Sequence, residues 1–253
     1  DVAVIGRVTD DQQFRALWHG AEVVNIPIRA LTKEAPVYQR PVARPAQQDQ
    51  LQQLDLSKIK EPKDVGATLK QLLDSPNLAS KEWIYRQYDQ FVRTNTVVGP
   101  GADAVVIRVK GTAKGLALTV DGNSRYCYLD PYVGGVVGVA EAARNLACVG
   151  ARPIGLTDCL NFGSPENPDV MWQFAQVIQG MRDACTALNI PVVSGNVSFY
   201  NETDGTPIYP TPTIGMVALH EKVERVVSPW LKTWGDAVVL LGRTREELGG
   251  SEY

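Results

Sequence analysis

Apolar and polar positions follow different periods along the chain, and these periods predict the order of its elements. A β-branched alternation at residues 2–5 predicts a strand, residues 18–20 a turn, and residues 21–31 a second strand. A hairpin of this kind is not stable by itself. We therefore expect residues 1–42 to belong to a domain that begins upstream.

The pattern changes over residues 43–92. The segment starts Gln-rich and Pro-interrupted, with few large apolar residues, which is typical of a linker. Helical patterns occur at 65–74 and at 80–92, and Ser80 is placed to cap the second of them.

An α/β pattern follows over about residues 93–222. Gly134–Gly135 precede one helical run, while Asn167 and Pro168 have the residue types of an N-cap and first position for a second helix, apolar at a 3.6-residue period over 171–188. The expected strands are 103–109, 115–122, 153–160, a buried one at 190–194, a hairpin return at 211–220, and 235–242 in a following domain.

Composition narrows the class of protein. The chain has 253 residues, 44% of them hydrophobic, and a net charge of -3, so it can bury a core and has no basic patch for a nucleic-acid partner. No apolar run of about 18 residues is present to cross a membrane. The cysteines lack metal-ligand or C-x-x-C spacing, so we expect reduced thiols in a cytoplasmic protein; they are Cys127, Cys148, Cys159 and Cys185. Because the chain starts without Met and inside a strand-like run, we expect a piece of a longer polypeptide.

The strand at 190–194 runs into an unusual sequence, Ser194–Gly195–Asn196–Val197–Ser198. A glycine after a strand lets phosphate approach backbone N–H groups. The Asn196 carboxamide is a suitable Mg²⁺ ligand, and Ser198 offers a hydroxyl to a substrate. The alternative is a loop in which these side chains only bond the backbone.

Two further sets of polar residues interrupt apolar elements. Asp158 ends a strand ahead of a helix, where open α/β sheets bind ligands, or it is simply a turn residue. Glu141 and Asn145 share one helical face and with Asp103 could bind a metal, or they lie on a solvated face. His19 and His220 lack a nucleophile motif and are expected to be structural, and there is neither a Walker A motif nor G-x-G-x-x-G.

Longer motifs carry a family resemblance. The stretches "LTDCLNFGSPENPDVMWQF" and "IPVVSGNVSFYNETDGTPIYPTPTIGMV" resemble the second half of phosphoribosylformylglycinamidine synthase, in its small bacterial-type form, synthesis subunit II. The resemblance covers the whole chain. It implies an α/β (α+β) fold of the aminoimidazole ribonucleotide synthetase-like superfamily, in which the sheets of two N-domains pair into a barrel-like centre.

The same resemblance implies a domain organisation. Residues 1–42 would end the C-domain of a first repeat, 43–92 would be a linker with short helices, 93–222 the second N-domain, and 223–253 the start of a second C-domain. A first repeat and its catalytic histidines are absent here, so we expect no catalytic residue in this chain and no activity from it alone.

The family reaction is an ATP-dependent ligation in purine biosynthesis. Formylglycinamide ribonucleotide is phosphorylated on its amide oxygen, and ammonia from a separate glutaminase subunit displaces phosphate from the iminophosphate; a small bridging subunit completes the complex. ATP and Mg²⁺ are the implied cofactors. Residue by residue, Asp158 and Gly195 resemble ATP-binding positions, Asn196 a magnesium ligand and Ser198 a substrate-binding serine.

Two alternatives belong to other classes. One is a non-catalytic nucleotide-binding or structural repeat of the same superfamily. The other is a related kinase or synthetase, such as thiamine-monophosphate kinase or selenophosphate synthetase. Those relatives carry Gly-Asp-Asp-Ala where this chain has Gly-Ala-Asp-Ala at residues 101–104, which favours the amidine synthase. Asp103, Glu141 and Asn145 resemble an auxiliary nucleotide–metal site of long forms of that enzyme.

Overall fold

The computed structural model describes residues 2–253 and divides the chain into two compact units, Asp1–Arg40 and Pro41–Tyr253. In the first unit, β1 (Gln13–Trp18) and β2 (Ala21–Pro27) form an antiparallel hairpin, followed by α1 (Ile28–Leu31). The turn was predicted correctly, and the second strand, expected over residues 21–31, ends at Pro27 because residues 28–31 form α1. The strand expected at residues 2–5 is absent because that segment has no partner for its backbone hydrogen bonds.

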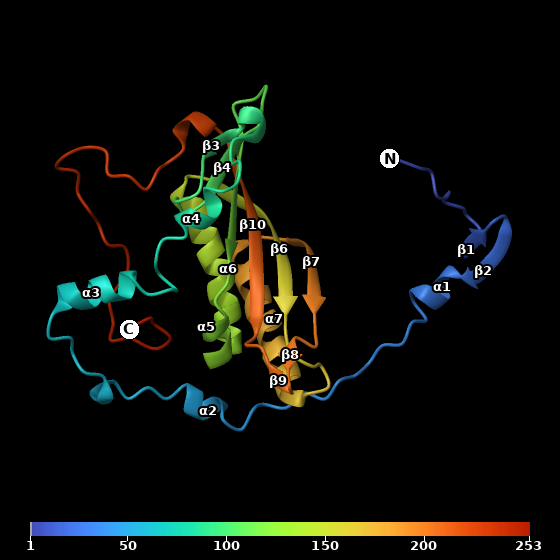
Figure 1. The fold of residues 1–253 in the computed structure, drawn as a ribbon, viewed down its shortest axis with the longest axis horizontal. Helices are drawn as coiled ribbons and strands as arrows, with labels where there is room; N and C mark the ends of the chain where they lie inside the picture. Colours follow the sequence, from blue (N-terminus) through green and yellow to red (C-terminus); the bar gives the residue numbers. More distant parts are fainter. Residues whose placement is uncertain (1) are drawn as a thin grey trace. The chain divides into compact units, whose positions relative to one another are not determined.

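The second unit contains one large sheet (Figure 1). Its strands are β3 (Thr96–Val98), β4 (Val105–Arg108), β5 (Gly115–Asp121), β10 (Thr211–His220), β6 (Arg152–Asn161) and β7 (Val192–Ser198), in that spatial order. Neighbouring strands are antiparallel except β6 and β7, which are parallel. The return strand β10 therefore pairs with β5 and β6, and not with β7 as a hairpin would. The sheet is open and does not close into a barrel.

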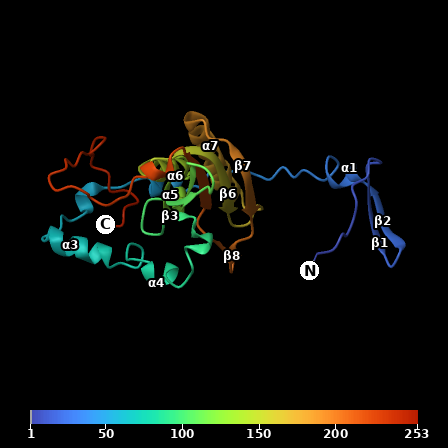
Figure 2. The ribbon, with the colours of Figure 1, turned by 90° about the horizontal axis from the view of Figure 1, so that it is seen from above.

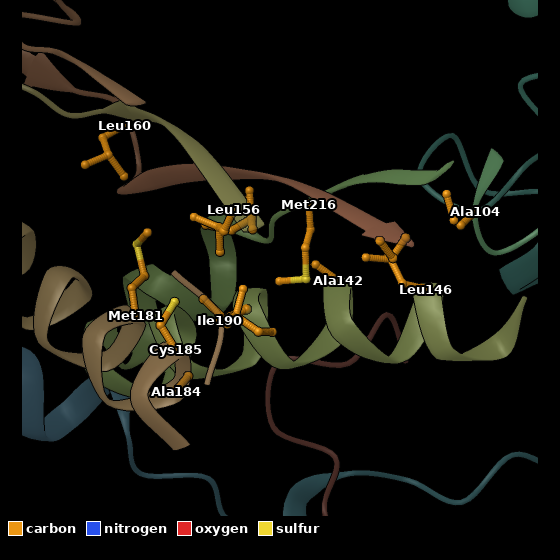
Figure 3. Close-up of a cluster of buried hydrophobic side chains, with 14 of the residues drawn as sticks. Ala104, Ala142, Leu146, Leu156, Leu160, Met181, Ala184, Cys185, Ile190 and Met216 are labelled. Carbon is orange, nitrogen blue, oxygen red and sulfur yellow. The ribbon is translucent and has the colours of Figure 1, made fainter. Parts of the chain in front are cut away.

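Three helices accompany the sheet: α5 (Ser124–Leu129), α6 (Pro131–Cys148) and α7 (Pro168–Leu188). Figures 1 and 2 show α6 and α7 together on one side of the sheet. The core lies between these two layers, where side chains such as Leu156 and Met216 from the strands point toward the helices (Figure 3). No helix among residues 2–253 is long and apolar enough to cross a bilayer.

Two glycines allow α6 and α7 to cross closely. A methyl group added to Gly180 would lie 2.0 Å from the Tyr132 carbonyl oxygen, and one added to Gly135 would lie 2.4 Å from that of Val177. Gly134 and Gly135 lie inside α6, so the prediction that they begin this helix is wrong. The helix begins at Pro131, with the Asp130 carboxylate accepting from the N–H of Val133 at 3.0 Å.

The start of α7 agrees with the sequence. The Asn167 side chain accepts from the N–H of Asp169 at 2.9 Å, and Pro168 occupies the first turn. Its C-terminus is closed by Asn189 in the left-handed conformation, with φ 54°. In the chain, β6 precedes α7 and β7 follows it. The two caps therefore limit where β6 can end and where β7 can begin.

The segment before the sheet is partly packed on it. Its elements are α2 (Gln48–Leu51), η1 (Leu56–Lys58), α3 (Val65–Leu73), α4 (Glu82–Tyr85) and η2 (Val92–Thr94). The helix expected at 65–74 is confirmed, while the one at 80–92 is reduced to α4, whose N–H of Glu82 donates to Ser80 Oγ at 3.2 Å.

Residues 43–52, called here the docked segment, contact α5, α6 and α7. Gln48 is fully buried and donates through Nε2 to the Leu129 carbonyl at 2.6 Å. Gln52 donates to Asp130 Oδ2 at 3.0 Å, and the N–H of Ala43 donates to the Pro168 carbonyl at 3.2 Å. The sequence had suggested only a linker here, because glutamines are seldom buried.

Beyond the sheet, β8 (Glu202–Thr203) pairs with β9 (Thr206–Pro207), and η3 (Val223–Arg225) follows β10. The strand expected at 235–242 is absent, and Val238 and Leu241 are 86% and 91% exposed. A strand needs a hydrogen-bonding neighbour, and this segment finds none among the described residues. The domain boundaries at 42, 92 and 222 remain predictions.

Candidate functional site

The four candidate site residues lie on two paired strands. Asp158 is on β6, and Gly195, Asn196 and Ser198 are on β7. Because these strands are parallel, their C-terminal ends lie side by side at the same end of the sheet. Asp158 is paired with Gly195, Cys159 with Asn196, and Asn161 with Ser198. The sequence motifs that are almost 40 residues apart are thus brought together by strand pairing.

Alternation along the strands divides these residues between two faces. Leu156 and Leu160 are buried beneath the helices, so Asp158 between them also faces the helix layer. Asn196 and Ser198 are offset by one and three residues from Gly195, the partner of Asp158, and therefore lie on the opposite face. The four candidate residues therefore lie on both faces of the sheet, at its edge strand β7 and that strand's neighbour β6.

The edge position also changes the expected burial of β7. Val192 and Val193 are 50% and 70% exposed, although the sequence suggested a buried strand. A strand at the end of a sheet has a neighbour on one side only, and α7 covers this one incompletely. The residues of β7 are thus accessible to a ligand or to another protein surface.

On the helix side, the Asp158 carboxylate lies over the α-carbon of Gly195 and borders a cavity of about 740 Å³ between the strands and α7. Burial raises the pKa of Asp158 above its usual range. Burial, and then the neighbouring Asp158 carboxylate, raise the pKa of the Cys185 thiol. Other lining residues are Ile178, Met181, Arg182, Thr186 and Ile190.

On the opposite face, polar groups from the two strands form a row. Ser194 Oγ donates to Thr157 Oγ1 at 2.7 Å. The Asn196 carboxamide is exposed and has no hydrogen-bond partner among the described residues. Its oxygen is thus available as a single neutral ligand for a cation such as Mg²⁺.

The loops after β6 and β7 are held together by packing and hydrogen bonds. Phe162 and Phe199 both lie against Phe174 of α7, with ring centroids 5.1 and 5.2 Å from it. Asn201 donates to carbonyl groups at the ends of both strands. Sequence reasoning did not single out Asn201, because an Asn before Glu-Thr-Asp-Gly is typical of any turn.

The other predicted metal ligands are not brought into a cluster. Asn145 donates to Asp121 Oδ1 at 2.7 Å, and Asp103 is exposed in the turn before β4. Glu141 is partly buried on α6. Within residues 2–253, no three His, Cys, Asp or Glu side chains are grouped to hold a metal ion.

The histidines lie away from these strand ends, whereas the partly buried Cys159 lies beside Asn196 in the register and the buried Cys185 lies next to Asp158. His19 is in the β1–β2 turn beside Trp18. His220 is buried at the end of β10, and neither of its ring nitrogens has a hydrogen-bond partner among residues 2–253. The four cysteines carry free thiols. Burial raises the pKa of Cys127 to about 12, so its nucleophilic thiolate is not populated at neutral pH.

Comparison with known proteins agrees with the motifs. Residues 101–220 match a family model described as AIR synthase related protein, N-terminal domain. Phosphoribosylformylglycinamidine synthase subunit PurL of Moorella thermoacetica is 58% identical over 253 residues, which are 100% of this chain and 34% of that protein. The chain spans about a third of the length of the curated relatives it matches.

Solved structures give the same result. The T. maritima PurL complexed with ATP is 28% identical, with a TM-score of 0.63 over 87% of this chain and 33% of that one. The T. maritima PurL complexed with FGAR is 28% identical, with a TM-score of 0.64 over 87% and 32% of the two chains. The family resemblance and the α/β fold class predicted from the sequence are confirmed.

Proposed function

We propose that this chain, which is homologous throughout its length to PurL subunits of phosphoribosylformylglycinamidine synthase, supplies one part of an ATP-dependent amidine-forming active site. The observation that carries the proposal is the pairing of β6 with β7, which places Asp158, Gly195, Asn196 and Ser198 at one sheet edge. The complexes of T. maritima PurL with ATP and with FGAR supply the ligand classes.

In this reaction the amide oxygen of formylglycinamide ribonucleotide attacks the γ-phosphate of ATP, which releases ADP and leaves an iminophosphate. Ammonia then attacks the carbon that bears the phosphorylated oxygen, and the C–O bond to phosphate breaks to give the amidine. Phosphorylation is needed because an amide oxygen is a poor leaving group, and positioned donors stabilise the charge that develops. The residues of this chain bind and orient the reactants; the chain provides no catalytic acid or base.

Each candidate residue has a role that its surroundings support. Asp158 and the backbone at Gly195 contact ATP, and the partly buried Ser198 hydroxyl contacts the ribonucleotide. Mg²⁺, when bound, shields phosphate charge during transfer. The unengaged Asn196 carboxamide fits one position in its coordination shell. Water, phosphate oxygens and groups outside this chain would complete the shell.

The apolar sheet face that the helices leave uncovered fits an interface in a multi-domain assembly. We place this assembly in the cytoplasm. Leu118 and Val120 of β5 lie on the face away from the helices, and Val120 is 72% exposed. We propose that this face packs on the sheet of a sister N-domain. A glutaminase subunit and a small bridging subunit would deliver ammonia. Under this proposal, residues 93–222 are the N-domain and its neighbours 1–42 and 223–253 belong to C-domains.

Steady-state kinetics of the full-length protein test the proposal. Asn196→Ala should reduce the use of Mg-ATP by about 10- to 100-fold, the range typical of a disturbed metal shell. Ser198→Ala should raise KM for the ribonucleotide more than KM for ATP. Val193→Ala, at an exposed position of the same strand, is the matched control. Unchanged constants in both site variants would contradict the assignment, and would favour a structural role for this repeat.

A further inference from the structure

Asn201 connects the ends of the two site strands. Its Nδ2 group lies 2.9 Å from the carbonyl oxygen of Ser198, 3.1 Å from that of Phe162 and 3.3 Å from Ser198 Oγ. Its backbone N–H also donates to Phe162, at 3.1 Å, and its carbonyl accepts from the N–H of Ile208 at 3.0 Å. One residue thus bonds the end of β6, the end of β7 and the segment that leads to β10.

The turn holds the Asn201 amide in place. Tyr200, which precedes it, adopts a left-handed backbone with φ 60° and donates through its N–H to the Gly163 carbonyl at 3.0 Å. Phe199 packs against Phe174 on the other side of the turn. A non-glycine residue keeps such a conformation only when its surroundings enforce it, so the direction of the Asn201 side chain is set by the fold.

The contact with Ser198 Oγ decides how that hydroxyl can be used. A serine hydroxyl has one hydrogen to donate and two lone pairs to accept. The Asn201 Nδ2 group has no lone pair available, so Ser198 Oγ can only accept from it. Among the described residues none accepts the hydrogen of the Ser198 hydroxyl. That hydrogen remains available to an acceptor oxygen on the uncovered sheet face.

We infer that Asn201 is a positioning residue that keeps the Ser198 hydroxyl as a hydrogen-bond donor toward an acceptor oxygen of the bound ribonucleotide. The inference rests on the proposed function, because it assigns Ser198 to the ribonucleotide rather than to ATP. Asn201 acts through Ser198 and touches neither reactant. The chemistry recognised is an anionic or carbonyl oxygen, the acceptors that a formylglycinamide ribonucleotide presents.

A double-mutant cycle in the full-length protein tests this role. Ser198→Ala removes the hydroxyl and keeps the carbonyl oxygen that Asn201 also bonds. It should raise KM for the ribonucleotide about tenfold, the value of one hydrogen bond to a charged or polar ligand. Asn201→Ala should raise the same KM by a factor of about three to ten, while KM for ATP and kcat change less.

The decisive quantity is the coupling between the two positions. In the Ser198→Ala background, Asn201→Ala should have little further effect on KM for the ribonucleotide. Equal effects of Asn201→Ala in both backgrounds would overturn the inference while leaving the proposed role of Ser198 intact. If neither single variant changes any constant, the proposed role of Ser198 and the inference both fail.

Two further variants separate positioning from folding. Asn201→Asp keeps the size of the side chain but replaces the donor with an acceptor, so the Ser198 hydroxyl would turn inward and donate to it. This variant should raise KM for the ribonucleotide at least as much as Asn201→Ala, with melting temperature as the folding control. Thr203→Val, at an exposed position of β8, should leave all constants unchanged. An Asn201→Asp variant that is folded and has the wild-type KM would overturn the inference.

Discussion

Asp158 and Gly195 fit together because Gly195 has no side chain. A methyl group built on the Gly195 α-carbon would lie 2.3 Å from Oδ1 and 2.7 Å from Cγ of Asp158. The two residues are direct partners in the β6–β7 register. The glycine thus leaves room for the carboxylate beside the neighbouring strand.

Gly195→Ala should displace the Asp158 carboxylate. The side chain can rotate away, so we expect a loss of stability of only about 1–2 kcal/mol, as in other overpacked sites. KM for ATP should rise in the full-length protein, because the carboxylate leaves its position. Denaturant unfolding and kinetics measure the two effects. The Asp158→Ala background should abolish the additional effect of Gly195→Ala, and full additivity would show that the two residues are not coupled.

The partly buried carboxylate of Asp158 predicts a pH dependence. Because burial raises its pKa, the folded chain binds this proton more tightly than the unfolded chain. Its contribution to stability is complete below the ordinary pKa of aspartate and is lost as the pH rises through the folded value. Asp158→Asn should therefore be more stable than the wild type at pH 7, by less than about 1 kcal/mol since the carboxylate is partly solvated.

The advantage of Asp158→Asn should disappear at about pH 3, below the ordinary pKa. Thermal unfolding across this pH range measures it. Asp236→Asn, at an exposed position outside the helices and strands, is a matched control. A constant difference between Asp158→Asn and the wild type at all pH values would contradict the prediction.

The crossing of α6 and α7 predicts that alanine substitution changes stability differently at Gly180 and at Gly138. Gly180→Ala would place a methyl group 2.0 Å from the Tyr132 carbonyl oxygen, a backbone atom that cannot move without shifting the helix. We expect a loss of about 3 kcal/mol or more. At Gly138 the nearest atom is Ile214 Cγ1 at 3.5 Å, an ordinary contact. Gly138→Ala should be neutral or stabilising by up to about 1 kcal/mol. Equal melting temperatures for the two variants would contradict this packing.

The uncovered sheet face predicts self-association of this chain. Val120 is 72% exposed on that face, next to half-buried Leu118, and apolar surface of this kind is usually an interface. Sedimentation should show species above the 27.6 kDa monomer, and Val120→Lys should shift them toward monomer. Val65→Lys, 71% exposed on α3, should not. A wild-type chain that is monomeric at all concentrations would contradict the prediction.

Local signals account for the elements that were predicted correctly. The start of α7 follows from Asn167 and Pro168, whose side chains act within the first turn of the helix. The start of α6 was missed because Gly134–Gly135 resemble a turn in sequence. Their role is contact with α5 and α7, which no local pattern records.

Tertiary relationships account for what the sequence left open. The motifs identified Asp158 and Ser198, but only the strand register shows that they face opposite sides of the sheet. The segment 235–242 has the composition of a strand, yet a strand depends on a neighbour that the described chain does not provide. Asn201 carries no signal of its own, because its importance lies in which three oxygens its amide reaches.

The docked segment has a practical consequence for dissecting the protein. An expression boundary drawn at residue 93, where the α/β pattern begins, would remove Gln48 and Pro45, both fully buried. The Leu129 carbonyl would then lose the donors from Gln48 and Gln52. A recombinant domain that starts near residue 41 keeps the docked segment. Proteases added to the intact chain should spare residues 43–52 and cleave the more exposed stretch that follows.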